Sequence, residues 1–338
     1  MRFVELFAGA GGCSLGLERA GLQCVAHAEI HPHARAVLRY QWPAVPLLGD
    51  VTTLNGADHP PCDLLAGGSP CQDLSVAGKR AGLEGARSSL FYHQARLWEE
   101  CGAPYLLWEN VAGALSSQHG RDFSTVLSTL VGTPVAVPAD GWGRGGVASG
   151  PAAVAAWRVF DLRYMGPGGF GPPQRRVRVF VLAARAGAAD PAAILALTQG
   201  VCGHPDPREA APQEAALSGV VSRQPLTSGL CGGQIARALT ACHTATGRLD
   251  PNEQTFVFQA RTHNTKLSPR RLMPVEAERL QGWPDDHTAT GIDEQGRAYA
   301  LKDTPRYLLC GNGCGAPHAE WIGRRLMAMN NAPMRGVG

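Results

Sequence analysis

Residues 67–75, with the sequence GGSPCQDLS, place a single cysteine directly after a proline in a short polar turn that begins with glycines. Cys71 in this setting has three interpretations: a buried structural thiol, a metal ligand, or a nucleophile presented to a substrate. The thiolate is the reactive form of cysteine, and a proline restricts the local backbone. The stretch therefore marks a candidate site for covalent catalysis, in which one difficult step is divided into easier ones.

Two further motifs supply groups that would assist a thiolate. Glu109 lies in the stretch WENVAG at 108–113, and Arg176 and Arg178 lie in GPPQRRVRVF at 171–180. A carboxyl group can hydrogen-bond a substrate or supply a proton, and arginines favour the ionised form of a nearby thiol. The alternatives are a surface acid at the end of a strand and a solvated basic face, because RRVRV alternates as strands do.

A glycine-rich turn near the start of the chain indicates a cofactor site. The stretch ELFAGAGGCSLG at 5–16 puts three glycines between an expected strand and an expected helix: Gly9, Gly11 and Gly12. Such a turn brings backbone close to a ligand, but Ser14 breaks the G-x-G-x-x-G dinucleotide pattern and no phosphate-loop lysine follows. Glu29 and Asp50 end the next two expected strands, which suits a nucleoside without a pyrophosphate. S-adenosylmethionine is the candidate; the alternative is a tight turn with two surface acids.

A metal site is not expected. Cys310, Cys314 and His318 have a C-x3-C-x3-H spacing, but no convincing fourth ligand accompanies them. The ten cysteines are scattered without paired spacing, which predicts reduced thiols in a cytoplasmic protein. No apolar run approaches the length of a membrane span, and a net charge of +3 is too small to establish a nucleic-acid partner.

Strands and helices alternate through the first half of the chain. This pattern predicts an α/β fold with a doubly wound, mostly parallel sheet of the Rossmann-like type. The expected strands are 3–8, 23–30, 46–51, 62–68, 104–111 and 176–186, and the expected helices are 14–21, 32–41 and 88–102. A last helix over 316–330 places Trp321, Ile322, Leu326 and Met329 along one face, which predicts packing against the core.

Changes in composition divide the chain. Residues 1–186 are predicted to form the catalytic and cofactor-binding domain, with a Gly-, Pro- and Ala-rich loop insertion at about 132–157. Residues 187–268 lose the alternation of strands and helices, which predicts a smaller domain of irregular or β-rich character. Residues 269–338 are predicted to return to the catalytic domain.

The chain resembles the cytosine-5 DNA methyltransferase family of bacterial or phage type almost from end to end. Six motifs occur in the family's order: LFAGAGG (6–12), GGSPCQDLS (67–75), WENVAG (108–113), GPPQRRVRVF (171–180), RRLMPVEAERLQGWPDD (270–286) and GNGCGAP (311–317). One short motif is compatible with chance, whereas six in order are highly specific. Val177, where many relatives carry an acid, and the variant GNGCGAP depart from the family pattern without removing a residue assigned to chemistry.

The resemblance implies a mechanism. Cys71 would add to carbon 6 of a flipped-out cytosine, Glu109 would hydrogen-bond ring nitrogen 3 and the exocyclic amine, and Arg178 would contact the carbonyl oxygen, with Arg176 beside it. Residues 72–89 would close over double-stranded DNA with Lys79, Arg80 and Arg87. The residues implied to contact S-adenosylmethionine, together with the glycines above, are Phe7, Gly11, Glu29, Ile30, Asp50, Val51, Pro70, Leu90 and Asn312.

The resemblance further implies that residues 187–268 read the target sequence. The candidate base-reading side chains are Arg223, Gln224, Arg237, Thr240, His243, Arg248 and Arg261. The main hypothesis is a monomeric enzyme of a restriction–modification system or a phage, with a cognate endonuclease as a possible partner. The alternatives are a transfer-RNA cytosine-5 methyltransferase and, from another class, a catalytically silent DNA-binding protein.

Overall fold

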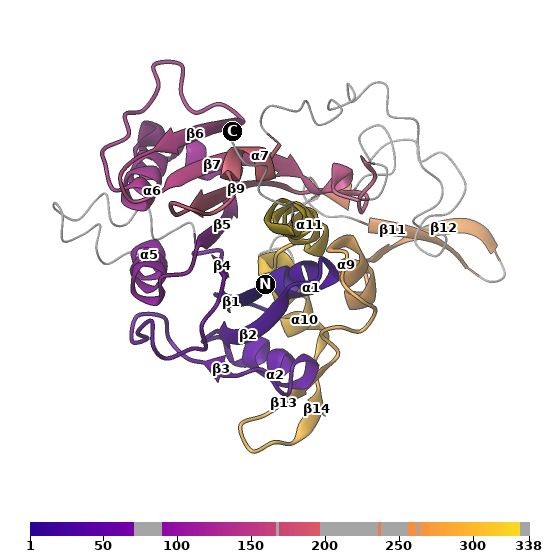
Figure 1. Cartoon of the computed structure of the whole chain (residues 1–338). Helices are drawn as coiled ribbons and strands as arrows, with labels where there is room; N and C mark the ends of the chain where they lie inside the picture. The colour runs from indigo at the N-terminus through magenta and orange to yellow at the C-terminus, as the bar shows by residue number, and fades with distance from the viewer. Residues whose placement is uncertain (71–89, 167–168, 197–235, 238–255, 262–263, 332–338) are drawn as a thin grey trace.

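The computed structural model describes residues 1–70, 90–166, 169–196, 236–237, 256–261 and 264–331, and for 236–237, 256–261 and 264–270 it describes only the backbone (Figure 1). Cys71, the segment 72–89 and most of the expected recognition region therefore lie outside the described residues. In the part described, no helix is both long and apolar enough to cross a membrane.

Short elements alternate along the chain as expected. Up to the end of the central sheet they are β1 (Arg2–Leu6), α1 (Gly12–Arg19), β2 (Gln23–Ala28), α2 (Pro32–Gln41), β3 (Leu47–Leu48), β4 (Leu64–Gly67), α5 (Leu90–Cys101), β5 (Tyr105–Val111), η1 (Ala112–Leu115), η2 (Ser117–Gly120), α6 (Arg121–Val131), β6 (Gly145–Ser149), β7 (Val154–Asp161), η3 (Leu162–Tyr164), β8 (Gln174–Arg175) and β9 (Val177–Ala184). The later elements are α7 (Pro191–Ile194), β10 (Ala236–Arg237), β11 (Phe256–Arg261), β12 (Asn264–Arg271), α9 (Pro274–Leu280), β13 (Thr290–Ile292), β14 (Ala298–Ala300), α10 (Asp303–Asn312) and α11 (Ala316–Asn331).

The central sheet has eight strands in the order β3-β2-β1-β4-β5-β9-β7-β6. The first five are parallel, and β9, β7 and β6 each run antiparallel to their neighbours. This architecture confirms the expected doubly wound, mostly parallel sheet. Because β9 is antiparallel to β5, the beginning of β9 lies at the edge where the parallel strands end.

Side chains that alternate along each strand build one core on each face of the sheet. In β1, Val4 and Leu6 pack into the cluster that contains residues of α5 and α6, whereas Phe3 packs into the cluster that contains residues of α1 and α11. Successive strand residues point to opposite faces, so apolar runs such as FVEL suit a sheet covered on both sides. Figure 1 shows α5 and α6 together on one side of the sheet and α1 with α11 on the other.

The expectation of a loop insertion over 132–157 is wrong in its second half. Residues 145–149 form β6, and 154–161 form β7, which pairs with both β6 and β9 in the central sheet. The glycines and alanines that suggested a loop are compatible with a strand here because both faces are covered. Ala155 packs on one side and Ala156 on the other, so the tertiary context outweighs the weak strand preference of alanine.

The last helix packs as the sequence predicts, with one exception. Ile322 and Leu326 are fully buried against α1 and the sheet, and Trp321 is partly buried beside them. Met329, expected on the same face, has 38% of its surface exposed because it lies near the helix end.

Close contact between α1 and α11 depends on a glycine. A Cβ atom added at Gly16 would lie 2.2 Å from the Ala316 carbonyl oxygen and 2.7 Å from the Ala319 Cβ. Two helix backbones meet at this point, so neither the Ala316 oxygen nor the Ala319 Cβ can rotate away. Gly16 thereby allows the C-terminal helix to cover the face beneath the glycine-rich turn.

Replacing Gly16 with alanine is expected to destabilise the protein. Forcing apart a close helix contact costs about 1–3 kcal/mol, more than the roughly 1 kcal/mol that alanine adds as a better helix former. Chemical denaturation would show a lower midpoint for Gly16→Ala. Gly143→Ala is the matched control, because its nearest atom would be 3.6 Å away; equal midpoints for the two variants would contradict the argument.

Candidate active site

A cavity of about 530 Å³ opens at the carboxyl ends of β1, β2, β4 and β5. Parallel strands that end together leave a crevice at this edge, where ligands of open α/β sheets bind. Of the residues predicted for the site, those that line the cavity are Phe7, Gly9, Glu29, Ile30, Asp50, Val51, Pro70, Leu90, Glu109, Arg176, Arg178 and Asn312. The structure thus brings together residues from 7 to 312 in the sequence.

Glu29 connects the glycine-rich turn to the start of α2. One carboxylate oxygen accepts a hydrogen bond from the Gly9 N–H at 2.7 Å, and the other accepts from the Ile30 and His31 N–H groups at 2.8 and 2.7 Å. The Arg35 guanidinium also donates to the Glu29 carbonyl oxygen at 2.7 Å. Glu29 is therefore held rigidly at the cavity wall, with its remaining lone pairs available to a ligand's hydroxyl groups.

The three glycines of the turn have different roles. Gly9 lines the cavity, has φ +54, and an added Cβ would meet nothing within 4 Å. Gly11 and Gly12, which are predicted as cofactor contacts, are not among the residues that line the cavity. An added Cβ would lie 2.4 Å from the Trp42 ring at Gly11 and 2.2 Å from the Cys314 carbonyl oxygen at Gly12. Those two glycines allow Trp42, directly after α2, and the turn between α10 and α11 to approach closely.

Asp50 and its neighbours line the cavity together with Glu29. The Asp50 carboxylate accepts a hydrogen bond from the Thr52 N–H at 2.9 Å and so fixes the turn after β3. Val51 is buried, and Leu90 begins α5 across the cavity. This side combines apolar walls with two carboxylates, as a nucleoside ligand requires.

Glu109 and Arg178 form an ion pair on the opposite side of the cavity. Their closest atoms, Glu109 Oε1 and Arg178 Nε, are 2.9 Å apart, and both side chains are largely buried, with 20% and 14% exposed. Arg178 is opposite Val111 in the β5–β9 register, so the reversal of β9 places its guanidinium beside the end of β5. A paired carboxylate and guanidinium present donors and acceptors in a fixed plane, which suits recognition of a planar base.

Arg176 lines the cavity beside Arg178, and its guanidinium is directed toward backbone carbonyl oxygens. It is 1% exposed, and its guanidinium donates to the Gly313 carbonyl oxygen at 2.5 Å and to the Gly311 carbonyl oxygen at 3.4 Å. Burial, and then the nearby charge of Arg178, lowers the pKa of Arg176 to about 10. Arg176 therefore holds the end of α10, where Asn312 lines the cavity.

Two residues that the sequence analysis missed anchor the chain that leads into Cys71. Asn110 Nδ2 donates to the Ser69 carbonyl oxygen at 3.0 Å, and Trp108 Nε1 donates to Ser69 Oγ at 2.9 Å. Both lie in the stretch WENVAG, on either side of Glu109. Their place in this motif was the sequence feature that could have indicated them. The backbone through Pro70 is thus fixed against β5 directly before Cys71, which itself lies outside the described residues.

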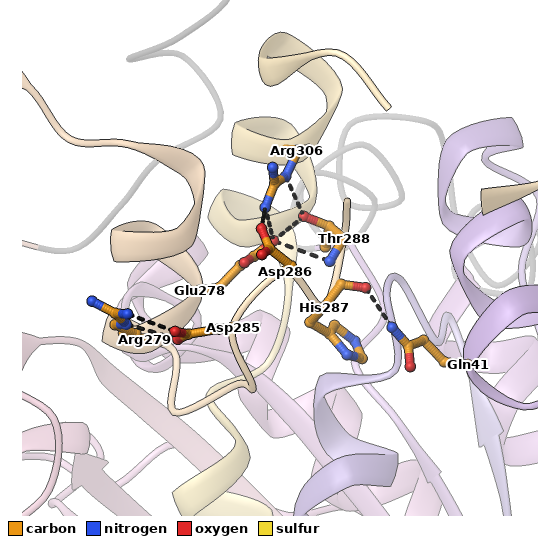
Figure 2. Close-up of polar contacts among 8 residues, drawn as sticks. All are labelled: Gln41, Glu278, Arg279, Asp285, Asp286, His287, Thr288 and Arg306. Atoms are coloured by element: carbon orange, nitrogen blue, oxygen red, sulfur yellow. Dashed lines mark hydrogen bonds and ion pairs between the residues drawn. The ribbon is translucent and has the colours of Figure 1, made fainter. Parts of the chain in front are cut away.

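A second group missed by the sequence analysis supports the α10 wall of the cavity. The Arg306 guanidinium donates to Glu278 at 2.9 Å, to Asp286 at 3.0 Å and to Thr288 at 3.3 Å (Figure 2). Glu278 is fully buried and also accepts from the Thr288 N–H at 3.0 Å. These contacts join α9 to α10, whose residues Leu308, Leu309, Gly311 and Asn312 line the cavity.

A buried polar cluster lies beneath the glycine-rich turn. The Glu5 carboxyl accepts hydrogen bonds from the Ser14 hydroxyl and, at 2.9 Å, from the Ser14 N–H, and Ser14 Oγ lies 2.8 Å from His27 Nε2. Burial raises the pKa of Glu5 from 4.5 to about 8 and lowers the pKa of His27 from 6.5 to about 4. At neutral pH both groups are therefore mainly uncharged, which suits their burial.

The raised pKa of Glu5 predicts that stability falls with rising pH. The folded state binds the proton more tightly, so this contribution is complete below pH 4.5 and is lost as pH rises through about 8. Between pH 7 and 9, where His27 is mainly neutral in both the folded and the unfolded state, the wild type should lose on the order of 1–2 kcal/mol more than Glu5→Gln. Chemical denaturation at the two pH values measures the difference, with Glu99→Gln as the exposed control; parallel losses in all three proteins would contradict the assignment.

The C-x3-C-x3-H residues make no metal centre in the described part of the chain. Cys310 and His318 are buried, Cys314 is half-buried, and within these residues no group of three or more His, Cys, Asp or Glu side chains is arranged to hold an ion. Burial lowers the pKa of His318 well below its ordinary value.

Comparisons with known proteins identify the family. The sequence model described as C-5 cytosine-specific DNA methylase matches residues 1–133. The Type II methyltransferase M2.BsuMI of Bacillus subtilis is 30% identical over 338 residues, which cover 96% of this chain and 75% of that protein. A protein of Escherichia phage P1 named DNA N-6-adenine-methyltransferase is 27% identical over 94% of this chain and 60% of its own length.

A solved structure, that of S. pombe Dnmt2 methyltransferase, matches with a TM-score of 0.61 and 15% identity over 98% of this chain and 99% of that chain, which shows the likeness of fold. The family match and the Bacillus subtilis relative together identify an S-adenosylmethionine-dependent methyltransferase. More closely, the chain belongs to the C-5 cytosine-specific DNA methylase family, whose activity is methylation of DNA cytosine at carbon 5. The expected cofactor and family are thereby confirmed.

Loss of the Glu29 carboxylate is expected to weaken cofactor binding. Glu29→Ala removes the partner of the Gly9 N–H and the acceptor at the cavity wall, so the Kd for S-adenosylmethionine should rise about 10–100-fold, or roughly 1.4–2.8 kcal/mol. Isothermal titration calorimetry measures it. Glu294→Gln is the control, since that side chain is 76% exposed and its ion pair within the described part of the chain is with Arg39 at 3.6 Å; an unchanged Kd in a folded Glu29→Ala variant would remove Glu29 from the site.

Proposed function

We propose that this protein transfers the methyl group of S-adenosylmethionine to carbon 5 of a cytosine flipped out of duplex DNA, with Cys71 as the nucleophile. The observation that carries the proposal is the arrangement of the cavity. The Glu109–Arg178 ion pair and the anchored chain leading into Cys71 share one space with the Glu29 side. A base that enters this cavity would lie near the segment after β4 that leads into Cys71 and also near the Glu29 side.

Cys71, Glu109 and Arg178 have separate roles in the proposed reaction. The Cys71 thiolate adds to carbon 6, which makes carbon 5 electron-rich enough to attack the sulfonium methyl group that the cofactor supplies. The Glu109 carboxyl hydrogen-bonds ring nitrogen 3 and the exocyclic amine, where charge develops, and Arg178 orients that carboxyl and contacts the base's carbonyl oxygen. After transfer, the proton on carbon 5 leaves to solvent and the thiolate is expelled from carbon 6, which restores the ring.

The cofactor-binding role is proposed for the residues on the Glu29 side. Phe7, Gly9, Ile30, Asp50, Val51, Pro70, Leu90 and Asn312 would complete that side with Glu29. Arg176 supports this set indirectly, through its contacts at the end of α10, where Asn312 lies. The target cytosine has to leave the duplex to reach the cavity, at a cost of a few kcal/mol that contacts to backbone and pocket offset.

The proposal also covers the recognition region, the oligomeric state, the cellular location and the partner. Residues 187–268 would read the target sequence, and 269–338 complete the catalytic domain, as the packing of α11 on α1 supports. We propose a monomeric cytoplasmic enzyme, specifically a DNA (cytosine-5-)-methyltransferase of a restriction–modification system or phage. A cognate endonuclease would be its partner in the first case.

The methylated product tests the proposal directly. Expression in a host that lacks its own cytosine methylation, followed by nucleoside mass spectrometry and base-resolution sequencing, should yield 5-methylcytosine at one short motif. Cys71→Ser should reduce the rate at least 10³-fold while its Kd for S-adenosylmethionine stays unchanged, because the thiol acts only on the base. Covalent capture on DNA containing 5-fluorocytosine, dependent on cofactor, would report the adduct itself.

Three results would overturn the proposal. N6-methyladenine in the host DNA would assign the activity named for the phage P1 relative instead. Methylation confined to transfer RNA in a competition with duplex DNA would assign an RNA substrate. Full activity in Cys71→Ser would exclude the covalent mechanism.

A further inference from the structure

A second, small cavity of about 40 Å³ adjoins the active-site cavity. The two cavities have five lining residues in common: Phe7, Gly9, Gly68, Glu109 and Asn312. Glu5 lines the small cavity but is not among the residues that line the larger one. A water molecule needs about 10–15 Å³ of such space, so the small cavity has room for two or three. It therefore offers a water-filled connection between the active site and the polar cluster beneath the glycine-rich turn.

The side chains of Glu5 and Glu109 project from the same face of the central sheet. In β1, Phe3 packs on the face covered by α1 and α11 and Val4 on the other, so Glu5 points toward α1. In β5, Leu107 packs on the α1 face, and Glu109 follows it by two residues and points the same way. Both carboxyl groups therefore face the layer that contains the small cavity.

The strand between these two residues leaves room for a connection. Glu5 is opposite Ala66 in β4, which is opposite Leu107 in β5. Glu109 thus lies two strands across and two residues further along, with its Cα atom about 12 Å from that of Glu5. In the gap, a Cβ atom added at Gly68 would lie 2.8 Å from Glu109 Oε2. The glycine gives the Glu109 carboxyl this space, and two glutamate side chains with one or two waters would span the separation.

The hydrogen bonds of Glu5 leave one of its carboxyl oxygens for the small cavity. Oε2 accepts from both the N–H and the hydroxyl group of Ser14, and Oε1 makes no hydrogen bond within the described residues. The proton of a neutral Glu5 therefore belongs on Oε1. Because burial raises the pKa of Glu5 to about 8, the side chain keeps this proton at neutral pH.

The proposed methyl transfer requires a proton at the base. When the Cys71 thiolate adds to carbon 6, ring nitrogen 3 becomes basic, and Glu109 is the group that can protonate it. The Arg178 guanidinium, 2.9 Å from Glu109, does not give up its proton in proteins. The proton that Glu109 donates must therefore come from another group.

We propose that Glu5 supplies a proton to Glu109 through water in the small cavity, an inference that rests on the proposed function. As Glu109 gives its proton to ring nitrogen 3, a water molecule gives one to Glu109, and Glu5 gives one to that water. After methyl transfer the ring carries a positive charge, and nitrogen 3 returns the proton along the same path. No proton is gained or lost on this path over one cycle. Glu5 touches no substrate and acts through Glu109.

Glu5→Gln separates the proton from the structural contacts of Glu5. The amide oxygen can still accept from the N–H and the hydroxyl group of Ser14, so the start of α1 keeps its partner. The amide nitrogen has no acidic proton to give. A purely structural role would therefore survive this substitution largely intact, whereas proton supply would not.

Single-turnover methyl transfer, with saturating S-adenosylmethionine and duplex DNA that carries the target motif, tests the proposal. The wild-type rate should fall as pH rises through about 8, where Glu5 loses its proton. Glu5→Gln should be about 10–100-fold slower at pH 7 and should lack this fall, with an unchanged Kd for S-adenosylmethionine. Glu5→Asp retains an acidic proton and should recover much of the rate. Ionisation of Cys71 raises the rate with pH in every variant and does not produce the fall.

A substitution in the wall of the small cavity tests the water path without changing either carboxyl group. Cys13→Val places a larger side chain in this wall, so it should displace water and reproduce the slow rate of Glu5→Gln. Glu18→Gln is the control, because Glu18 accepts from Trp42 Nε1 at 2.9 Å and is not among the residues that line either cavity. It should keep the wild-type pH profile.

Two measurements do not depend on the rate. Infrared difference spectra should show a protonated carboxyl band at pH 7 that is lost in Glu5→Gln and that fades in the wild type as pH rises through 8. A high-resolution crystal structure should show ordered water between Glu5 and Glu109. A cavity without water, or an ionised Glu5 at pH 7, would contradict the proposal.

The outcomes distinguish this inference from the proposed function. Equal rates and pH profiles in the wild type and Glu5→Gln, with 5-methylcytosine formed by both, would overturn the proton path and leave the proposed function intact. An equal loss of rate at every pH, together with weaker cofactor binding, would make Glu5 a structural residue only and would also overturn it. A wild type that forms no 5-methylcytosine would overturn the proposed function, and the proton path with it.

Discussion

The direction of one strand controls how the site is assembled. Strand β9 runs antiparallel to β5, so it begins where β1, β2, β4 and β5 end. A parallel strand in this place would have begun at the opposite edge and carried Arg176 and Arg178 away from the cavity. The reversal lets residues about 70 apart in sequence, Glu109 and Arg178, form an ion pair at 2.9 Å. The rest of the site is arranged around this edge.

Loops at the edge of a sheet need fixed partners, because their backbone groups have no neighbouring strand. Here side chains supply those partners. Glu29 accepts from three backbone N–H groups, Asn110 donates to the Ser69 carbonyl oxygen, and Arg176 donates to the carbonyl oxygens of the 311–313 turn. The same contacts that satisfy the loops also shape the cavity, so the distinction between structural and functional residues is weak in this region.

Burial of ionisable groups is costly, and the protein limits that cost in two ways. Glu5 and His27 lose their charge, as the opposite shifts in their pKa values indicate. Glu278 is instead paired with Arg306, which also contacts Asp286 and Thr288. In both cases the polar groups join segments distant in sequence, around the glycine-rich turn and α10, which a purely apolar core would position less specifically.

The sequence by itself determined the fold class, the family and the set of motifs that converge on the cavity. Alternation of apolar strands with helices fixes a parallel sheet, and its strand ends then meet at one edge for geometric reasons. Tertiary structure alone decided the rest. It made strands of 145–149 and 154–161, because coverage on both faces outweighs a weak local preference. It placed Gly11 and Gly12 at points of close packing and turned Arg176 toward backbone carbonyl oxygens. These outcomes depend on contacts between residues far apart in the chain, which local sequence patterns do not encode.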